Sequence, residues 1–143
     1  MVFVTDFNDL YSDFIMYHYK KNDHRGKPES YDLCEKGSNL SCGDEITLYL
    51  SLEDGRISRI RFDGHGCTMS QSSASVLSEV LEGKTMAEAE NIVREFEGML
   101  RDERFDDEIL GEAAFFEGLK NYPLRIKCIT LPWLTMRKIL ERE

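Results

Sequence analysis

Apolar residues at three- and four-residue steps predict an amphipathic helix near the start of the chain. The stripe covers residues 6–20 and includes Phe7, Leu10 and Phe14. The next stretch, residues 21–39, carries glycine, proline, serine and many charges. This composition is typical of a connection between elements, so we expect a mobile loop with a short strand around residues 31–34.

The clearest strand pattern follows that loop. Apolar residues occupy every second position from Ile46 through Leu48 and Leu50, which is the period of a strand with one buried face. The dipeptide at residues 54–55, Asp-Gly, predicts a tight turn because glycine tolerates the positive φ that such turns require. Residues 60–62 continue the apolar face, so the sequence predicts an antiparallel hairpin.

Start and stop signals predict four further helices, at about residues 69–81, 85–100, 106–119 and 123–140. Thr85 and Glu88 form a capping-box pattern, in which each side chain satisfies a backbone N–H at the helix start. Asp106 and Pro123 are residue types favoured at helix starts. The predicted fold class is α+β, with a small antiparallel sheet of about three strands packed against several α-helices.

Composition and charge narrow the class of protein. The 143 residues, 41% hydrophobic and 31% charged, are typical of one globular domain spanning residues 1–143. No apolar run is long enough to cross a bilayer, and the N-terminus has no secretion signal, so we expect a cytoplasmic protein. A net charge of −9 disfavours nucleic acids and anionic membranes as partners and favours a basic patch on another protein.

The chain has four cysteines, Cys34, Cys42, Cys67 and Cys128. In a reducing cytoplasm they are not expected to form structural disulfides, which leaves metal binding, sulfur chemistry or simple burial. No C-x-x-C pair is present, so the sequence does not encode a local zinc knuckle.

Two of these cysteines are predicted to meet at one end of the hairpin. Cys42 precedes the first strand and Cys67 follows the second, where a helix N-terminus favours its thiolate. Cys128 joins them only if the last helix packs at the same end, which the sequence permits but does not fix. Pro132 adds to this question, because a proline there predicts a kink or a late helix start.

Asp44 is the natural fourth donor for a tetrahedral site, since it lies two residues after Cys42. A carboxylate is a hard ligand in a soft set and is more easily displaced, which favours a site that exchanges something over a closed structural one. Inert buried thiols and a purely structural zinc site remain the alternatives. Arg125 is a candidate for electrostatic support of the anionic ligands, and His65 is expected close to the site. Cys34 is not a candidate for this site and is expected to be a thiol on a strand or loop.

Three segments each surround one cysteine: residues 39–44 (NLSCGD), residues 64–75 (GHGCTMSQSSAS) and residues 122–128 (YPLRIKC). In this order they resemble the three cysteine motifs of the IscU/NifU-like family of iron–sulfur cluster assembly scaffolds, and the resemblance covers roughly the whole chain. Lys127 stands where IscU proteins carry histidine, and additional residues near 101–121 separate the last two motifs. Both features resemble the SufU branch.

The resemblance implies a function. SufU-like proteins hold zinc with three cysteines and one aspartate and accept sulfur from a cysteine desulfurase. Carried over by motif, the ligands are Cys42, Asp44, Cys67 and Cys128, and Cys42 is the persulfide acceptor. The implied partners are a SufS-like cysteine desulfurase and downstream iron–sulfur assembly or apo-proteins.

Two other functions stay open at this point. The three cysteines could hold a transient [2Fe–2S] cluster, or iron, on a scaffold that passes the cluster on. The site could also be a zinc staple in an adaptor protein without sulfur traffic. The sequence therefore leaves undecided whether the chain has a zinc-dependent sulfurtransferase-like activity or is a non-enzymatic scaffold.

Overall fold

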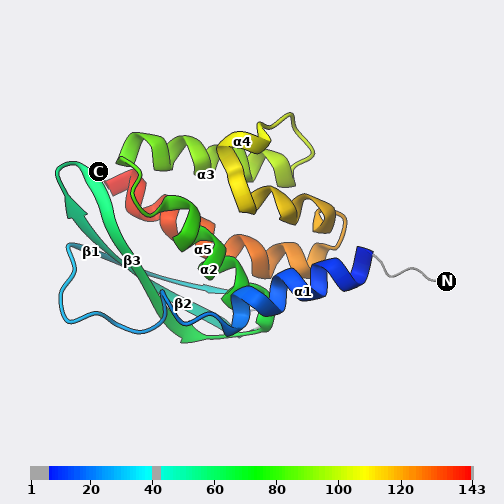
Figure 1. Ribbon diagram of the computed structural model, residues 1–143, viewed down its shortest axis with the longest axis horizontal. Helices are drawn as coiled ribbons and strands as arrows, with labels where there is room; N and C mark the ends of the chain where they lie inside the picture. Colours follow the sequence, from blue (N-terminus) through cyan, green and yellow to red (C-terminus); the bar gives the residue numbers. More distant parts are fainter. Residues whose placement is uncertain (1–6, 40–42, 143) are drawn as a thin grey trace.

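The computed structural model describes residues 7–39 and 43–142, with side chains from Ser12 onward. One three-stranded sheet and a set of helices make up this part of the chain (Figure 1). In chain order the elements are α1 (Phe7–Lys20), β1 (Leu33–Asn39), β2 (Asp44–Glu53), β3 (Arg56–His65), α2 (Thr68–Leu81), α3 (Met86–Leu100), α4 (Asp107–Leu110), the 3₁₀ helix η1 (Gly111–Leu119) and α5 (Pro123–Arg142). The predicted α+β fold class is confirmed.

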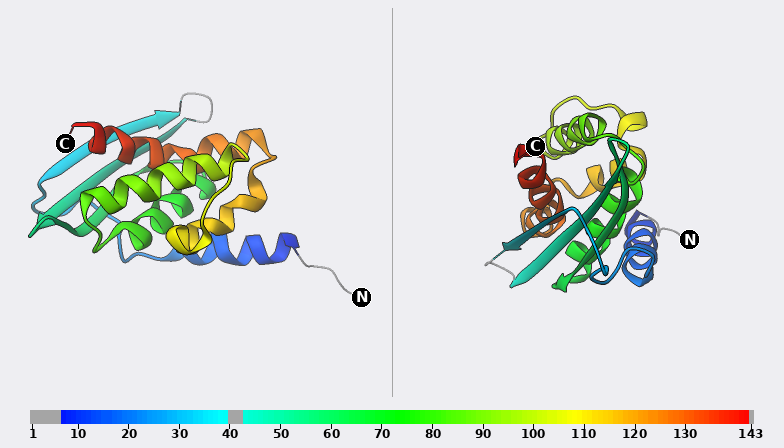
Figure 2. Two further views of the ribbon diagram at one scale, coloured as in Figure 1. Left: turned by 90° about the horizontal axis from the view of Figure 1, so that it is seen from above. Right: turned by 90° about the vertical axis from the view of Figure 1, so that its left-hand side faces the viewer.

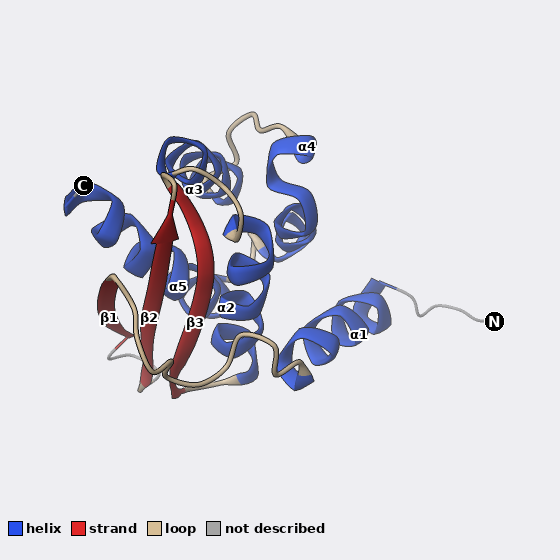
Figure 3. Ribbon diagram, turned by 60° about the vertical axis from the view of Figure 1, so that its left-hand side comes forward, coloured by secondary structure: helices blue, strands red, loops and turns tan. Residues whose placement is uncertain are grey.

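The sheet is antiparallel in the order β1-β2-β3, and helices α2 and α5 lie against one face of it (Figure 3). The predicted hairpin is present, with Asp54 and Gly55 both at positive φ (54° and 77°) in its turn. Ile46, Leu48 and Leu50 are fully buried on the helix-covered face. The open end of the hairpin, where Asp44 begins β2 and β3 ends, is therefore brought next to the start of α2.

The strand β1 differs from the expectation of a mobile loop over residues 21–39. It begins at Leu33 and pairs with β2 along all seven of its residues, so the strand expected around residues 31–34 lies later and is longer. The sequence pattern concealed it, because Gly37 stands at an inward position where an apolar residue would be expected. That glycine allows close approach of Thr135 on α5, and any Cβ at position 37 would collide with the threonine hydroxyl. Figure 2 shows α5 running alongside β1 as a result.

One predicted helix is divided by a glycine, and another continues through a proline. The helix expected over residues 106–119 starts as predicted, with Asp106 accepting the N–H of Glu108, but it is divided at Gly111 (φ 55°, ψ −130°) into α4 and η1. Pro132 predicted a kink or a late helix start, and the late start is wrong, because α5 begins at Pro123 and contains Pro132 in its interior. Cys128 consequently lies on a formed helix, upstream of the proline.

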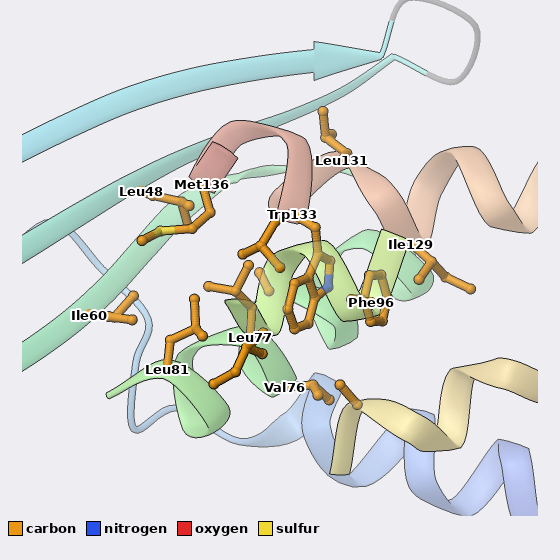
Figure 4. Packing of buried hydrophobic residues seen from close by; sticks show 14 of the residues in the cluster. Leu48, Ile60, Val76, Leu77, Leu81, Phe96, Ile129, Leu131, Trp133 and Met136 are labelled. Atoms are coloured by element: carbon orange, nitrogen blue, oxygen red, sulfur yellow. The ribbon is translucent and has the colours of Figure 1, made fainter. Parts of the chain in front are cut away.

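The buried core lies between the sheet, α2, α3 and α5 (Figure 4). Trp133 of α5 stacks on Phe96 of α3, with ring centroids 3.9 Å apart, and both side chains are fully buried. The serine-rich start of α2 lets α5 approach closely. The Ser73 hydroxyl donates to the carbonyl of Ile129 (2.6 Å) and accepts the indole N–H of Trp133 (3.0 Å).

Polar contacts attach α1 and the residues after it to α2. The Ser72 hydroxyl donates to the carbonyl of Ile15 (2.7 Å), and the fully buried His18 ring contacts the Ser75 hydroxyl (3.0 Å). Lys21, which follows α1, forms an ion pair with Glu79 of α2 (2.7 Å). Directional bonds therefore link α1 to α2 in addition to the apolar packing of Ile15.

We expect Ser73→Ala to lower the free energy of unfolding by about 1–3 kcal/mol, because it leaves the buried Trp133 N–H without an acceptor. Urea denaturation measures the loss. Ser58→Ala, at an exposed hydroxyl, is the control and should have little effect. A cost for Ser73→Ala that persists unchanged in a Trp133→Phe background would contradict the assignment to this bond.

Glu79 should contribute pH-dependent stability. Partial burial opposes its ionisation, but hydrogen bonds from Lys21 and His24 outweigh burial and lower the pKa of this carboxyl below its usual value of 4.5. A carboxyl whose pKa is lowered by folding stabilises the protein above its unfolded pKa, and this stability is lost as the pH falls through the folded value. The difference in urea midpoint between wild type and Glu79→Gln should thus be full at pH 6 and shrink below pH 4.5.

Glu90→Gln provides the control for this measurement, since the Glu90–Arg94 pair is exposed. A difference between wild type and Glu79→Gln that stays constant from pH 6 to pH 3 would show that the Glu79 charge is not what stabilises the interface.

Candidate metal centre

Three of the four residues proposed as ligands from the sequence lie together. One carboxylate oxygen of Asp44 and the Sγ atoms of Cys67 and Cys128 are all within 4.8 Å of one another. They come from the first residue of β2, the N-cap of α2 and the second turn of α5. Cys42, the fourth predicted ligand, lies outside the residues that the structure describes.

Asp44 is held in a fixed orientation by the helix that follows the hairpin. Its Oδ1 accepts the backbone N–H of Cys67 (2.9 Å), while its Oδ2 lies 3.7 Å from the Cys67 Sγ. The start of a helix has N–H groups without intrahelical partners, and Asp44 satisfies one of them from across the hairpin. Although Asp44 is only 1% exposed, its carboxylate is thus bonded on one side and directed at the thiols on the other.

A glycine and a serine shape the space around Asp44 and Cys67. A Cβ at Gly66 would lie 2.6 Å from Asp44 Oδ1 and 2.7 Å from the Ser70 hydroxyl oxygen, so only glycine fits there. The buried Ser70 hydroxyl donates to the carbonyl of Cys67 (3.1 Å) and lies 4.0 Å from its Sγ. Sequence analysis did not assign these two residues to the site, although both fall within the second cysteine motif.

Cys128 reaches the cluster because α5 packs against both α2 and the sheet. The sequence left this open, and the tertiary structure supplies the reason. Ser73 of α2 bonds to the carbonyl of Ile129, the residue after Cys128, and this bond fixes that part of α5 against α2. Cys128 is buried, whereas Cys67 is exposed at the end of the sheet. The cluster is therefore anchored inside the protein and open to solvent on one side.

The chemistry of this donor set fits a thiophilic divalent ion. Two thiols and one carboxylate from separate elements provide three ligand atoms, and tetrahedral zinc sites take thiolates at about 2.3 Å and carboxylate oxygens at about 2.0–2.2 Å. The three atoms already lie close enough for one ion to draw them together. A fourth donor can approach from the exposed side, beside Cys67.

Most of the chain matches a known protein family. Residues 10–129 match the family described as the NifU-like N terminal domain. The chain belongs to this family. The sequence motifs had indicated it, and the recognition of an IscU/NifU-like chain is confirmed.

Curated relatives of this NifU-like chain carry two kinds of name. The iron–sulfur cluster assembly scaffold protein IscU of Thermotoga maritima is 40% identical over 136 residues, covering 95% of this chain and 96% of the relative. The zinc-dependent sulfurtransferase SufU of Bacillus subtilis is 32% identical over 144 residues, covering 100% of this chain and 97% of the relative.

Solved structures confirm the fold. The crystal structure titled a putative iron–sulfur cluster assembly scaffold protein for the SUF system, SufU, from Fervidobacterium islandicum matches with a TM-score of 0.88 and 42% identity. The match covers 93% of this chain and 98% of that one. A NifU-like N-terminal domain from Brucella abortus, at 20% identity and a TM-score of 0.83, shares the fold.

The remaining sequence candidates lie around the cluster or away from it. Arg125 is exposed, with its guanidinium 5.8 Å from the centroid of the Tyr122 ring. The side chain of His65 is 73% exposed and lies 3.6 Å from Glu45, and it does not join the three clustered donors. Cys34 lies on β1 opposite Tyr49 and is not among the three clustered donors, as expected. Burial raises the pKa of its thiol.

Within the described part of the chain, no helix is long and apolar enough to cross a membrane.

We expect Gly66→Ala to weaken metal binding, because the new methyl group must displace the Asp44 carboxylate or the Ser70 hydroxyl. Displaced groups that orient a ligand typically cost 10–100-fold in metal affinity, roughly the loss to be measured by competition with a zinc chelator. Gly98→Ala, near the end of α3 and away from the cluster, is the matched control and should retain affinity. Equal zinc affinity for both variants would contradict the described role of Gly66.

Proposed function

We propose that this NifU-like protein is a zinc-containing sulfur acceptor for iron–sulfur cluster assembly, which takes a persulfide from a SufS-like cysteine desulfurase onto Cys42. The observation that carries the proposal is the cluster of Asp44, Cys67 and Cys128, a mixed carboxylate–thiol set with one open side. The Bacillus subtilis relative named a zinc-dependent sulfurtransferase supports zinc as the ion. We infer that the protein acts in the cytoplasm, where its thiols stay reduced.

In this proposal Asp44, Cys67 and Cys128 are the permanent ligands and Cys42 is the ligand that leaves. Asp44 is bonded to the N–H of Cys67, which begins α2, and Cys128 belongs to α5. Gly43, the residue after Cys42 in the chain, has a φ of 72°, a backbone conformation that glycine adopts without strain. Because the other three candidates belong to packed elements, the proposal assigns release to Cys42.

Zinc, when bound, supplies a positive charge that keeps thiols ionised at neutral pH and undergoes no redox change. The Cys42 thiolate attacks the outer sulfur of the desulfurase persulfide. A new S–S bond forms between Cys42 Sγ and that sulfur, and the S–S bond in the donor breaks. The desulfurase cysteine leaves as a thiolate, and Cys42 carries the persulfide to downstream assembly proteins or apo-proteins. Electrons and atoms balance without an added oxidant.

A second candidate function is a scaffold on which a transient [2Fe–2S] cluster, or iron, is held by Cys42, Cys67 and Cys128. The specific observation that favours it is the Thermotoga maritima relative, which is named a scaffold protein and shares 40% identity over nearly the whole chain. Thiolates from separate elements around an open site also suit a cluster. Arg125, at the start of α5, would support the anionic ligands in either case.

Metal content and sulfur transfer decide between these functions. Protein purified with and without oxygen should contain about one zinc per chain, as expected for a four-ligand zinc site, and show no visible absorbance. Asp44→Ala should lose zinc, and Cys42→Ala should abolish the stimulation of a SufS-like desulfurase. Cys34→Ala, which removes a thiol outside the cluster, should leave both unchanged.

Other outcomes would reject the proposal. Iron and sulfide with a visible chromophore in the anaerobic sample would make the cluster scaffold the better function. Zinc retained without any desulfurase response in the wild type would indicate a structural staple.

A further inference from the structure

Arg25 makes a set of contacts that the site description does not account for. It lies in the segment after α1, and its guanidinium donates in three directions. The Nε–H bonds to the carbonyl of Lys21 (3.2 Å), one terminal nitrogen bonds to the carbonyl of Tyr19, and the other bonds to the side-chain oxygen of Gln71 (2.6 Å). One side chain thus joins the C-terminal end of α1 to the first turn of α2.

The same residue is attached to the sheet. Its guanidinium lies 5.3 Å from the centroid of the Phe62 ring on β3 and 5.4 Å from that of Tyr19. Its backbone pairs with Phe62, and its carbonyl accepts a bond from Arg61 (2.9 Å). The three hydrogen-bond acceptors of the Arg25 guanidinium are all neutral oxygens, and burial lowers the pKa of this arginine. Among the described residues, Arg25 is thus held by hydrogen bonds to neutral oxygens and by contacts with two aromatic rings.

Gln71 connects this arrangement to the metal centre. It is 5% exposed, and its backbone N–H donates to the carbonyl of Cys67 (3.2 Å). Gln71 consequently links Arg25 to the candidate ligand Cys67 through two hydrogen bonds. The carboxylate of Asp44 depends on the same turn, because it accepts the N–H of Cys67.

We propose that Arg25 is a positioning residue for the metal centre: its forked contacts hold the first turn of α2 against α1 and β3, and thereby hold Cys67 and Asp44 in register with Cys128. This inference rests on the proposed function in one respect, since it takes the three donors to be metal ligands. The planar guanidinium is required, because a lysine supplies a charge but cannot reach three acceptors in one plane.

The test uses the full-length chain loaded with zinc and measures the rate of zinc release to a chromophoric chelator. Arg25→Lys and Gln71→Met each cut the link from one side, and each should speed release about tenfold, the scale seen when groups behind a ligand are removed. The double variant should release zinc no faster than the single variants, because both remove the same connection.

Arg142→Lys is the matched control. Arg142 also joins a helix end to a strand, with bonds to the carbonyl of Cys34 (3.0 Å) and to Glu35 (3.5 Å), but far along β1 from the cluster. Its zinc release should equal that of wild type. Wild-type release in Arg25→Lys, or equal acceleration in Arg25→Lys and Arg142→Lys, would overturn the proposal in favour of simple charge or general stability.

A second measurement separates this inference from the proposed function. In metal-free protein, hydrogen exchange of the backbone amides of residues 67–73 should be faster in Arg25→Lys than in wild type, and unchanged in Arg142→Lys. If the wild type fails to bind zinc, the proposed function falls while the exchange result still decides whether Arg25 holds this turn. Unchanged exchange in Arg25→Lys would overturn the inference even with zinc bound.

Discussion

The hydrogen bond from the Cys67 N–H to the Asp44 carboxylate joins the two ends of the hairpin at the place where α2 begins. It satisfies a helix-terminal donor, which would otherwise be costly at a partly buried position. It also orients one carboxylate oxygen toward the thiol. Gly66 is required for this bond, since any side chain there would occupy the space of Asp44 or Ser70. One interaction therefore both satisfies the start of α2 and orients a donor of the candidate metal centre.

The position of the third candidate donor, Cys128, depends on long-range packing. Cys128 is placed by the packing of α5, whose Trp133 stacks on Phe96 and bonds to Ser73. These contacts are buried and numerous, so the position of α5 is determined by the whole core. The cluster accordingly combines two candidate donors fixed at the end of the hairpin with one fixed by the packing of the whole core.

Polar contacts link α1 and the residues after it to α2. Serine hydroxyls, His18, Lys21 and Glu79 supply directional bonds, and Arg25 extends the same interface to the turn that carries Cys67. Directional bonds define angles more sharply than apolar contacts do, which suits a segment that lies directly behind a ligand. The serine-rich stretch of α2 thus serves two neighbours, α5 through Ser73 and α1 through Ser72 and Ser75.

The sequence by itself determined the elements whose signals are local. The alternation from Ile46 to Leu50, the Asp54–Gly55 turn and the Thr85–Glu88 capping box all depend on neighbouring residues, and the structure contains each of them. The sequence predicted that Cys42 and Cys67 meet, with Asp44 as a further donor, because a hairpin returns the chain to its starting end, and the structure places Asp44 beside Cys67. Only the tertiary structure decided the rest. The strand β1 exists because β2 and α5 accept it despite a polar sequence, and Cys128 joins the site because long-range packing, which no local pattern encodes, places α5 against α2 and the sheet.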